Sequence, residues 1–152
     1  MKLSTKGRYG LRAIIDLARY SEKEPVSISS IAARQDISER YLEQLVGLLR
    51  KAGLVKSIRG ASGGYVLAKD VDKISVGDIL RALEGSLEPV ECAAFHGSDS
   101  CEAAGGCVTK YVWQRINESI NRTVDEISLK HLVEESKTVQ NSNLSTAKKC
   151  NN

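Results

Sequence analysis

ISERYLEQLVGLLRKAGLVKSIRGASGGYVLAKD, residues 37–70, combines a helical pattern with a strand pattern in one short stretch. Ser38 stands where a helix N-cap belongs, and the apolar residues that follow recur with helical spacing: Leu42, Leu45, Val46 and Leu49. Gly53 is suited to end that helix. Residues 54–58 and 65–67 then predict two strands joined by a glycine-rich turn, with Arg59 at the tip of the hairpin.

The residues before this stretch predict two further helices. The first has an apolar stripe made of Tyr9, Ala13, Ile14, Leu17 and Ala18, with Arg12, Asp16 and Arg19 off that stripe. Ser27 is suited to cap a short second helix, and Gln35-Asp36 forms a tight turn before the third. A short second helix, a tight turn, a longer third helix and a basic hairpin follow one another in the order of a winged helix-turn-helix. This fold places the third helix in a major groove and the wing at an adjacent minor groove.

The polar side of the predicted third helix supplies candidate DNA contacts. We expect Arg40 at the edge of the major groove, and Tyr41 and Gln44 within reach of phosphates or bases. Glu43 can accept a hydrogen bond from cytosine N4 but repels phosphates, so its expected role is selectivity. Arg59 is expected in or beside a narrow minor groove. The full candidate set is Ser38, Arg40, Tyr41, Glu43, Gln44 and Arg59.

Charge is divided unevenly along the 152 residues. Residues 1–60 contain 12 Lys/Arg and 6 Asp/Glu, whereas the remaining residues contain 10 and 13, respectively. A basic first part indicates a polyanionic partner for that part. No apolar run is long enough to span a membrane, and the N-terminal residues do not resemble a signal peptide. We therefore expect a cytoplasmic protein, in which cysteines are more often metal ligands or redox sensors than structural disulfides.

The second half of the chain predicts an arm outside the DNA-binding domain. Ser75 and Asp78 form a capping-box pattern for a helix that ends at Gly85. A long helix from about residue 110 to 127 has an apolar stripe, and Ser128 is suited to cap one more short helix. No large core remains within the chain for that stripe, so we expect it to pack against a second copy, although packing on its own domain is the alternative. Residues 140–152 are polar without periodicity and are predicted to be disordered.

Three of the four cysteines lie within ECAAFHGSDSCEAAGGC, residues 91–107. This segment is rich in Gly, Ser and Ala and has little apolar surface with which to order itself. The spacing C-x8-C-x5-C matches neither the short knuckles of structural zinc sites nor the four thiolates of a ferredoxin site. From spacing alone, an iron–sulfur cluster, zinc and thiol redox switching remain open.

The chain strongly resembles the IscR-type iron–sulfur regulators and the related cysteine-metabolism repressors of the same winged-helix family. The resemblance is carried by LSTKGRYGLRAIIDLA (residues 3–18), the stretch at 37–70 and ISVGDILRALEG (residues 74–85). It implies a homodimeric transcription factor that acts as a repressor and in which Cys92, Cys101 and Cys107 hold an iron–sulfur cluster, with 2Fe–2S favoured over 4Fe–4S. The two-fold symmetry of such a dimer matches a palindromic operator. The cysteine-metabolism branch generally lacks these three cysteines.

The sequence departs from the cluster-binding pattern at one position. The regulators that the loop matches best have a histidine three residues after the last cysteine, where this chain has Lys110. A protonated ammonium cannot ligate iron. The fourth ligand therefore stays open between His96, a group of the partner subunit, a water and a small exogenous thiol.

The predicted fold class is mainly α with a small β wing. Its parts are a winged helix-turn-helix domain (1–86), a cluster-binding loop (87–109), a dimerisation helix with a short C-terminal helix (110–139) and a disordered tail (140–152). The function favoured is a cluster-sensing transcriptional repressor that binds double-stranded DNA. A metal-free repressor with thiol-redox sensing is the main alternative, and a small iron–sulfur electron carrier leaves the basic wing unexplained. An enzyme is not expected, because the sequence has no phosphate loop and neither His96 nor His131 has a credible acid–base partner.

Overall fold

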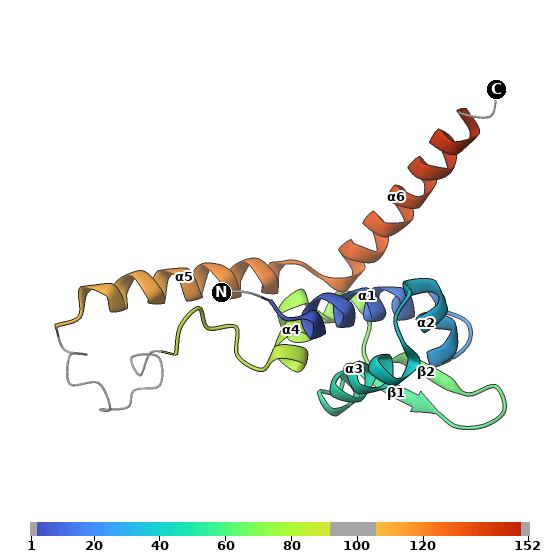
Figure 1. Ribbon diagram of the computed structural model, residues 1–152, viewed down its shortest axis with the longest axis horizontal. Helices are drawn as coiled ribbons and strands as arrows, with labels where there is room; N and C mark the ends of the chain where they lie inside the picture. The colour runs from blue at the N-terminus through green and yellow to red at the C-terminus, as the bar shows by residue number, and fades with distance from the viewer. Residues whose placement is uncertain (1–2, 92–105, 150–152) are drawn as a thin grey trace.

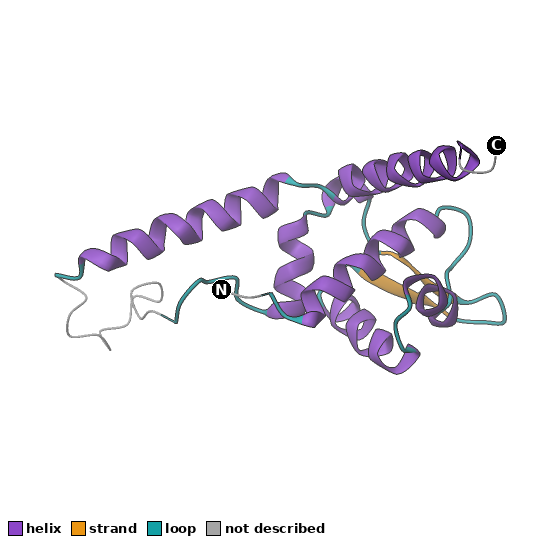
Figure 2. Ribbon diagram, turned by 45° about the horizontal axis from the view of Figure 1, so that its top comes forward, coloured by secondary structure: helices purple, strands orange, loops and turns teal. Residues whose placement is uncertain are grey.

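The computed structural model describes residues 3–91 and 106–149, with side chains described up to residue 142. Within these ranges the chain is mainly helical with a two-stranded sheet (Figures 1 and 2). The elements are α1 (Thr5–Tyr20), α2 (Ile28–Gln35), α3 (Glu39–Lys51), β1 (Val55–Ile58), β2 (Gly64–Leu67), a 3-10 turn η1 (Val71–Lys73), α4 (Val76–Glu84), α5 (Val108–Glu126) and α6 (Leu129–Lys149). The predicted fold class, mainly α with a β wing, is confirmed.

Helices α1 to α4 enclose most of the main apolar core, to which Leu129 and Val133 of α6 also contribute. Among its largest fully buried side chains are Ile14, Ile31, Leu42, Leu45, Leu49 and Ile79. Serine caps fix where the second and third helices begin, because Ser27 Oγ accepts from Ser30 N and Ser38 Oγ accepts from Tyr41 N. Between these helices the chain turns through Asp36, which has a left-handed φ of 52°. The helix-turn-helix therefore forms as its capping pattern predicts.

The two strands form the predicted hairpin. Strands β1 and β2 pair antiparallel, from Val55 opposite Leu67 to Ile58 opposite Gly64. The hairpin is attached to the helical core by a bridge between Val26 and Tyr65, whose backbones exchange hydrogen bonds of 2.9 and 2.8 Å. A Cβ at Gly64 would lie 2.6 Å from the Val26 carbonyl oxygen, so glycine permits this close approach. The wing is thus a fixed extension of the core.

Helix α4 begins with the predicted capping box, in which Ser75 and Asp78 bond reciprocally to each other's backbone N–H. The helix packs closely against α1, where a Cβ on Gly10 would lie 2.4 Å from Leu83 Cδ1. On its other side, Arg81 pairs with Asp125 of α5 at 2.8 Å. Helix α4 therefore joins the DNA-binding domain to the helical arm.

One buried charge was not anticipated from the sequence. Asp16 lies off the apolar stripe of α1, yet it is only 3% exposed. Its carboxylate accepts from Arg34 Nε and Nη2 and from Gln35 Nε2, so the buried charge is paired. The Arg34 guanidinium also lies 4.1 Å from the centre of the Tyr20 ring. This cluster ties α2 to α1 by polar contacts that an apolar periodicity does not report.

The last helix differs from its prediction. It begins at Leu129, with Ser128 Oγ accepting from His131 N as expected of a cap, but it continues to Lys149 rather than ending near residue 139. Residues 140–149, predicted to be disordered, are therefore helical. The interval contains neither Gly nor Pro, and the hydroxyls of Thr138 and Ser142 bond to carbonyls of the preceding turn. Polar composition alone does not end a helix.

Candidate nucleic-acid interface and cysteine segment

Helix α3 separates its apolar and polar faces as predicted. Leu42, Leu45 and Leu49 are buried, whereas Arg40, Glu43 and Gln44 are exposed. The first turn of the helix also contains Ser38, which is exposed at the N-cap and whose hydroxyl is 3.3 Å from Tyr41 N. The structure therefore brings four of the candidate residues to one open surface around the N-terminal half of α3.

Tyr41 lies at the edge of this surface and is partly buried. Its hydroxyl donates to Thr5 Oγ1 at 3.2 Å, and its ring meets the Tyr9 ring edge-on with centroids 6.1 Å apart. Both partners belong to α1, so the first helix supports the side of α3 that carries Tyr41. This packing supplies a fixed position for the tyrosine rather than a freely rotating side chain.

Arg59 is exposed at the tip of the wing, directly after β1. Gly60 follows with a φ of 117°, a conformation that side-chain-bearing residues rarely adopt, and its carbonyl accepts from Gly63 N. The turn between β1 and β2, to which Arg59 belongs, extends away from the helices (Figure 1). Lys56, on the neighbouring strand, is exposed as well. The wing is a basic arm beside α3.

Sequence reasoning missed one cation near the turn between α2 and α3. Arg12 lies off the apolar stripe of α1, and its Nη2 donates to the Gln35 carbonyl oxygen at 2.5 Å. Its guanidinium also lies 5.4 Å from the centre of the Tyr9 ring. Arg12 thereby satisfies a carbonyl at the end of α2. Its spacing from Tyr9 on α1 was the available signal, but the contact with Gln35 depends on tertiary packing.

The cysteine segment connects α4 to α5. Cys107 is the residue just before α5, and its sulfur lies 3.1 Å from Thr109 Oγ1. Hydrogen bonding from the Thr109 hydroxyl and then from Lys110 N lowers the pKa of the Cys107 thiol below its usual value. A lowered pKa favours the thiolate, the form that binds metal or attacks a disulfide. Cys92, Cys101 and His96 lie outside the described residues, as does Cys150.

The described residues contain no group of three or more His, Cys, Asp and Glu side chains arranged around one point. Lys110, which occupies the position of the histidine expected from the resemblance, is partly buried in the first turn of α5. The fit of an iron–sulfur cluster therefore rests on the chemistry of its one described ligand candidate. The lowered pKa of the Cys107 thiol favours the thiolate, the form in which cysteine binds iron.

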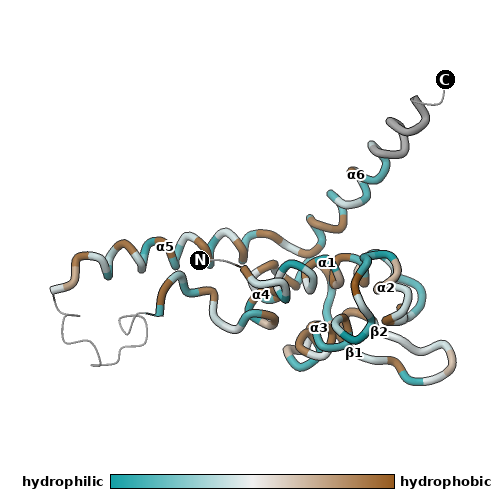
Figure 3. Tube along the Cα trace, viewed as in Figure 1, coloured by the Kyte–Doolittle hydropathy of each residue, from teal (hydrophilic) through white to brown (hydrophobic). Residues whose placement is uncertain are grey.

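Helix α5 has two unlike halves. Near its C-terminal end, Ile120 and Val124 pack against Val76, Leu80 and Leu87 of the same chain. Toward its N-terminal end, Val108 is 82% and Tyr111 61% exposed, and Val112 and Ile116 are exposed as well. Figure 3 shows apolar residues recurring along this helix where it extends away from the winged-helix domain. Among the residues that the structure describes, only the N-terminal half of the stripe lacks a partner within its own chain.

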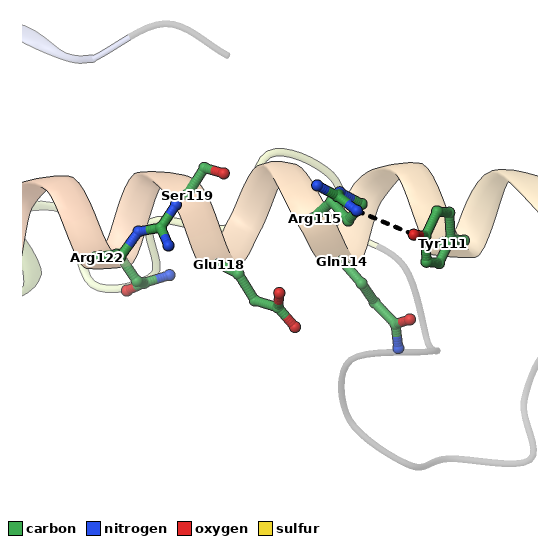
Figure 4. Close-up of a pocket in the computed structure, with 7 residues that line it drawn as sticks. Tyr111, Gln114, Arg115, Glu118, Ser119 and Arg122 are labelled. Carbon is green, nitrogen blue, oxygen red and sulfur yellow. Dashed lines mark hydrogen bonds between the residues drawn. The ribbon is translucent and has the colours of Figure 1, made fainter.

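The surface of α5 also has a hollow along residues 111–122, beside the apolar stripe. All of the residues that line it belong to α5: Tyr111, Gln114, Arg115, Glu118, Ser119, Asn121 and Arg122. Arg115 donates to the Tyr111 hydroxyl at 3.0 Å, and the other labelled side chains project from a single helix (Figure 4). A hollow made by one helix has no opposite wall. No helix within the described residues is long and apolar enough to cross a membrane.

Comparison with known proteins places this geometry in a family. The model of the Rrf2 family, described as an iron-dependent transcriptional regulator, matches residues 3–135. The transcriptional regulator CymR of Bacillus subtilis is 48% identical over 132 residues, which cover 87% of this chain and 89% of CymR. The regulator IscR of Vibrio atlanticus is 39% identical over 140 residues, covering 92% and 79%, respectively.

The solved structures that are similar to this chain include regulators with the same two names, CymR and IscR. CymR, the global cysteine regulator of B. subtilis, superposes with a TM-score of 0.73 at 46% identity, covering 89% of this chain and 98% of that structure. IscR of T. potens superposes with a TM-score of 0.74, also at 46% identity, covering 92% and 91%. The overall fold is thus equally similar to a regulator named for each branch.

Proposed function

The chain belongs to the Rrf2 family of transcriptional regulators, and on this premise we propose that it is a homodimeric repressor that senses iron–sulfur cluster status. The observation that carries the DNA-binding part is the open surface formed by the N-terminal half of α3 beside the basic wing. Glu43 lies among basic and amide side chains there, where it selects among bases rather than adding affinity. The established class of the protein excludes an enzyme and removes the electron carrier from consideration.

The exposed half of α5 supports a homodimer. Apolar side chains of this size seldom remain in water when a second copy presents the same surface. A two-fold dimer through this surface would cover Tyr111, Val112 and Ile116. It would also present two α3 helices to the two halves of a palindromic operator.

The position of the cysteines supports a cluster that acts on DNA binding. In the sequence Cys92 comes eight positions after the last residue of α4, Glu84, and Cys107 directly precedes α5. We assign Cys92, Cys101 and Cys107 as the thiolate ligands, with 2Fe–2S favoured over 4Fe–4S. The cluster would supply three sulfur–iron links that join the end of α4 to the start of α5. Since Lys110 cannot ligate while protonated, the fourth ligand comes from elsewhere, with His96 as the nearest candidate in sequence.

A second function has specific support. The identity with CymR, named as a cysteine regulator, is as high as that with IscR, and a low-pKa thiol at Cys107 equally suits a metal-free redox switch. In this alternative the same dimer binds DNA, and oxidation of the thiols replaces the cluster as the signal.

Operator binding tests the DNA-binding assignment. We expect Arg59→Ala to weaken binding to a selected operator by about 1–3 kcal/mol at fixed salt, because it removes a wing contact. Glu43→Ala should instead broaden the range of sequences bound. Lys130→Ala, on the exposed side of α6, is the matched control for loss of one charge. Unchanged affinity and selectivity in both test variants would reject the assigned surface.

Iron and sulfide content after anaerobic reconstitution separates the two sensing mechanisms. Wild-type protein should gain visible absorbance together with iron and acid-labile sulfide, and each of the three Cys→Ala variants should lose them. Cys150→Ala is the control, since that cysteine lies outside the segment. Equal iron and sulfide in wild type and the triple variant would reject the cluster and leave the thiol switch.

A further inference from the structure

A carboxylate from α4 caps the first helix of the DNA-binding domain. Glu84 Oε1 accepts from Ser4 N at 3.0 Å, from Ser4 Oγ at 2.7 Å and from Gly7 N at 3.0 Å. Ser4 Oγ in turn accepts from Lys6 N at 3.1 Å. Glu84 thereby satisfies the backbone N–H groups of Ser4 and Gly7, and it holds the Ser4 hydroxyl that accepts from Lys6 N. Glu84 is 77 or more positions away from these residues in sequence.

The close fit at Gly7 makes this contact specific. A Cβ on Gly7 would lie 2.5 Å from Glu84 Oε1, which is a steric clash. Glycine at this position therefore lets the carboxylate reach the amide. Because a carboxylate already occupies the N-terminal end of α1, that end is not available as a phosphate site.

The residue after Ser4 contacts the proposed reading helix. Thr5 Oγ1 accepts from the Tyr41 hydroxyl, and one turn further along α1 the Tyr9 ring packs against the same tyrosine. The proton of the Tyr41 hydroxyl is directed at Thr5, so the orientation of Tyr41 depends on where the first turn of α1 lies. The contacts thus run without a gap from Glu84 through Ser4 and Thr5 to Tyr41.

The same end of α4 also meets the helical arm. Arg81 lies one turn before Glu84 and bonds to Asn121 and Asp125 of α5. A Cβ on Gly77 would lie within bonding range of Asp125 Oδ1, so the two helices approach closely as well. Helix α4 therefore contacts α5 through one side and the N-terminus of α1 through its last residue.

We propose that Glu84 is a positioning residue for operator binding: it fixes the first turn of α1 and, through Thr5, the place of Tyr41 on the DNA-facing surface. The inference rests on the proposed DNA-binding function of α3. By this proposal α4 affects the position of Tyr41 on α3 through the first turn of α1, in addition to contributing to the apolar core. Glu84 itself touches no DNA in this mechanism.

A double-mutant cycle tests the proposal, using a duplex selected by the full-length wild-type protein from random-sequence DNA and a shuffled duplex for non-specific binding. Glu84→Ala should weaken operator binding about fivefold, the factor reached if the free energy of a lost helix cap is transmitted in full to the DNA-facing surface, while binding to the shuffled duplex is unchanged. Tyr41→Phe should cause a loss of its own but little further loss when combined with Glu84→Ala. Gly7→Ala, which leaves Glu84 intact but displaces its carboxylate, should reproduce the effect of Glu84→Ala.

Two controls separate positioning from general stability. Glu135→Ala removes an exposed carboxylate from α6 and should leave operator binding unchanged. The pair Glu84→Ala with Arg59→Ala should be additive, since the hydrogen bonds of Glu84 run to Ser4 and Gly7 and not to the wing. Circular dichroism establishes the folded fraction of each variant, and if Glu84→Ala is not folded, Glu84→Gln and Gly7→Ala are measured in its place.

The outcomes distinguish this inference from the proposed function on which it rests. If Glu84→Ala and Gly7→Ala reduce specific and non-specific binding equally, or if their losses add to that of Tyr41→Phe, Glu84 is only a stabilising cap and the inference is wrong. If Arg59→Ala, Arg40→Ala and Tyr41→Phe all leave operator binding unchanged, the assigned DNA surface is wrong. A loss confined to the operator and non-additive with Tyr41→Phe supports both.

Discussion

The winged-helix domain and the N-terminal half of α5 use similar apolar residues in opposite ways. In the domain, side chains such as Leu42 and Ile79 are fully buried among α1 to α4. In α5, Val112 is 46% and Ile116 is 38% exposed, although their spacing is just as regular. The core of the domain is closed within one chain, with Leu129 and Val133 of α6 contributing to it, whereas the described residues leave this surface of α5 uncovered.

This contrast indicates which properties depend on the isolated chain and which on assembly. The free energy that stabilises the domain comes from apolar burial within one chain and is independent of protein concentration. Burial of the α5 surface in a dimer depends on concentration by mass action. Helix α4 contacts both α5 and the helices of the winged-helix domain. A dimer formed through α5 would therefore be connected through α4 to the proposed DNA-binding surface.

The largest effect is expected from a charge on the exposed stripe. Ile116→Asp would leave an unpaired carboxylate in the dimer contact and weaken association by about 3–5 kcal/mol. Sedimentation should show monomers at micromolar concentration, and operator binding should fail, while helical content is retained. Val139→Asp is the matched control, because Val139 is exposed on α6. A wild-type protein that is monomeric at the same concentration would show that the stripe has no partner copy.

A substitution in the domain core should behave differently. Leu42→Ala removes a side chain with 0% exposure and should lower the free energy of unfolding by about 2–5 kcal/mol, through lost burial and the cavity that remains. Chemical denaturation should give the same loss at low and high protein concentration. For Val112→Ala the loss should grow with concentration, because its burial takes place in the dimer. Equal concentration dependence for both variants would remove the distinction between the regions.

Features that depend on a local sequence pattern were predicted correctly. The caps at Ser27, Ser38 and Ser75 and the hairpin tipped by Arg59 lie where their spacing placed them. The buried position of Asp16 was missed, because its partners Arg34 and Gln35 come from a helix whose packing angle no periodicity encodes.

The candidate site was predictable to the same extent. Exposure of Arg40, Glu43 and Gln44 follows from the helical period of α3. The contact between Tyr41 and Thr5 spans 36 positions, and the cap of α1 by Glu84 spans 80. Both depend on tertiary packing, which no local sequence pattern indicates. The extension of α6 was missed because polar composition was interpreted as disorder.

A smaller effect is expected on the reactivity of the Cys107 thiol, which directly precedes α5. Since hydrogen bonding lowers the pKa of Cys107, its alkylation by iodoacetamide should reach half of its maximal rate at a lower pH than that of a free cysteine. Thr109→Val removes the main donor and should move this midpoint to higher pH. Peptide mapping by mass spectrometry reports Cys107 separately from the other cysteines, in protein freed of metal. An unchanged midpoint in Thr109→Val would show that the hydroxyl does not stabilise the thiolate.

The smallest effect concerns the link between the two regions. The Arg81 guanidinium lowers the pKa of the Asp125 carboxyl, so their pair stabilises the fold above about pH 3.9, the usual pKa of aspartate, and is lost as the pH falls through the lower folded value. Asp125 is about half exposed, and solvent screening limits the contribution to about 0.2–1 kcal/mol. Asp125→Asn should therefore lower the free energy of unfolding by this amount at pH 7 and by progressively less toward pH 2. Asp72→Asn, in the exposed 3-10 turn, is the control for loss of one charge. A difference from wild type that persists unchanged at pH 2 would mean that α4 and α5 are joined by packing at Gly77 and not by the ion pair.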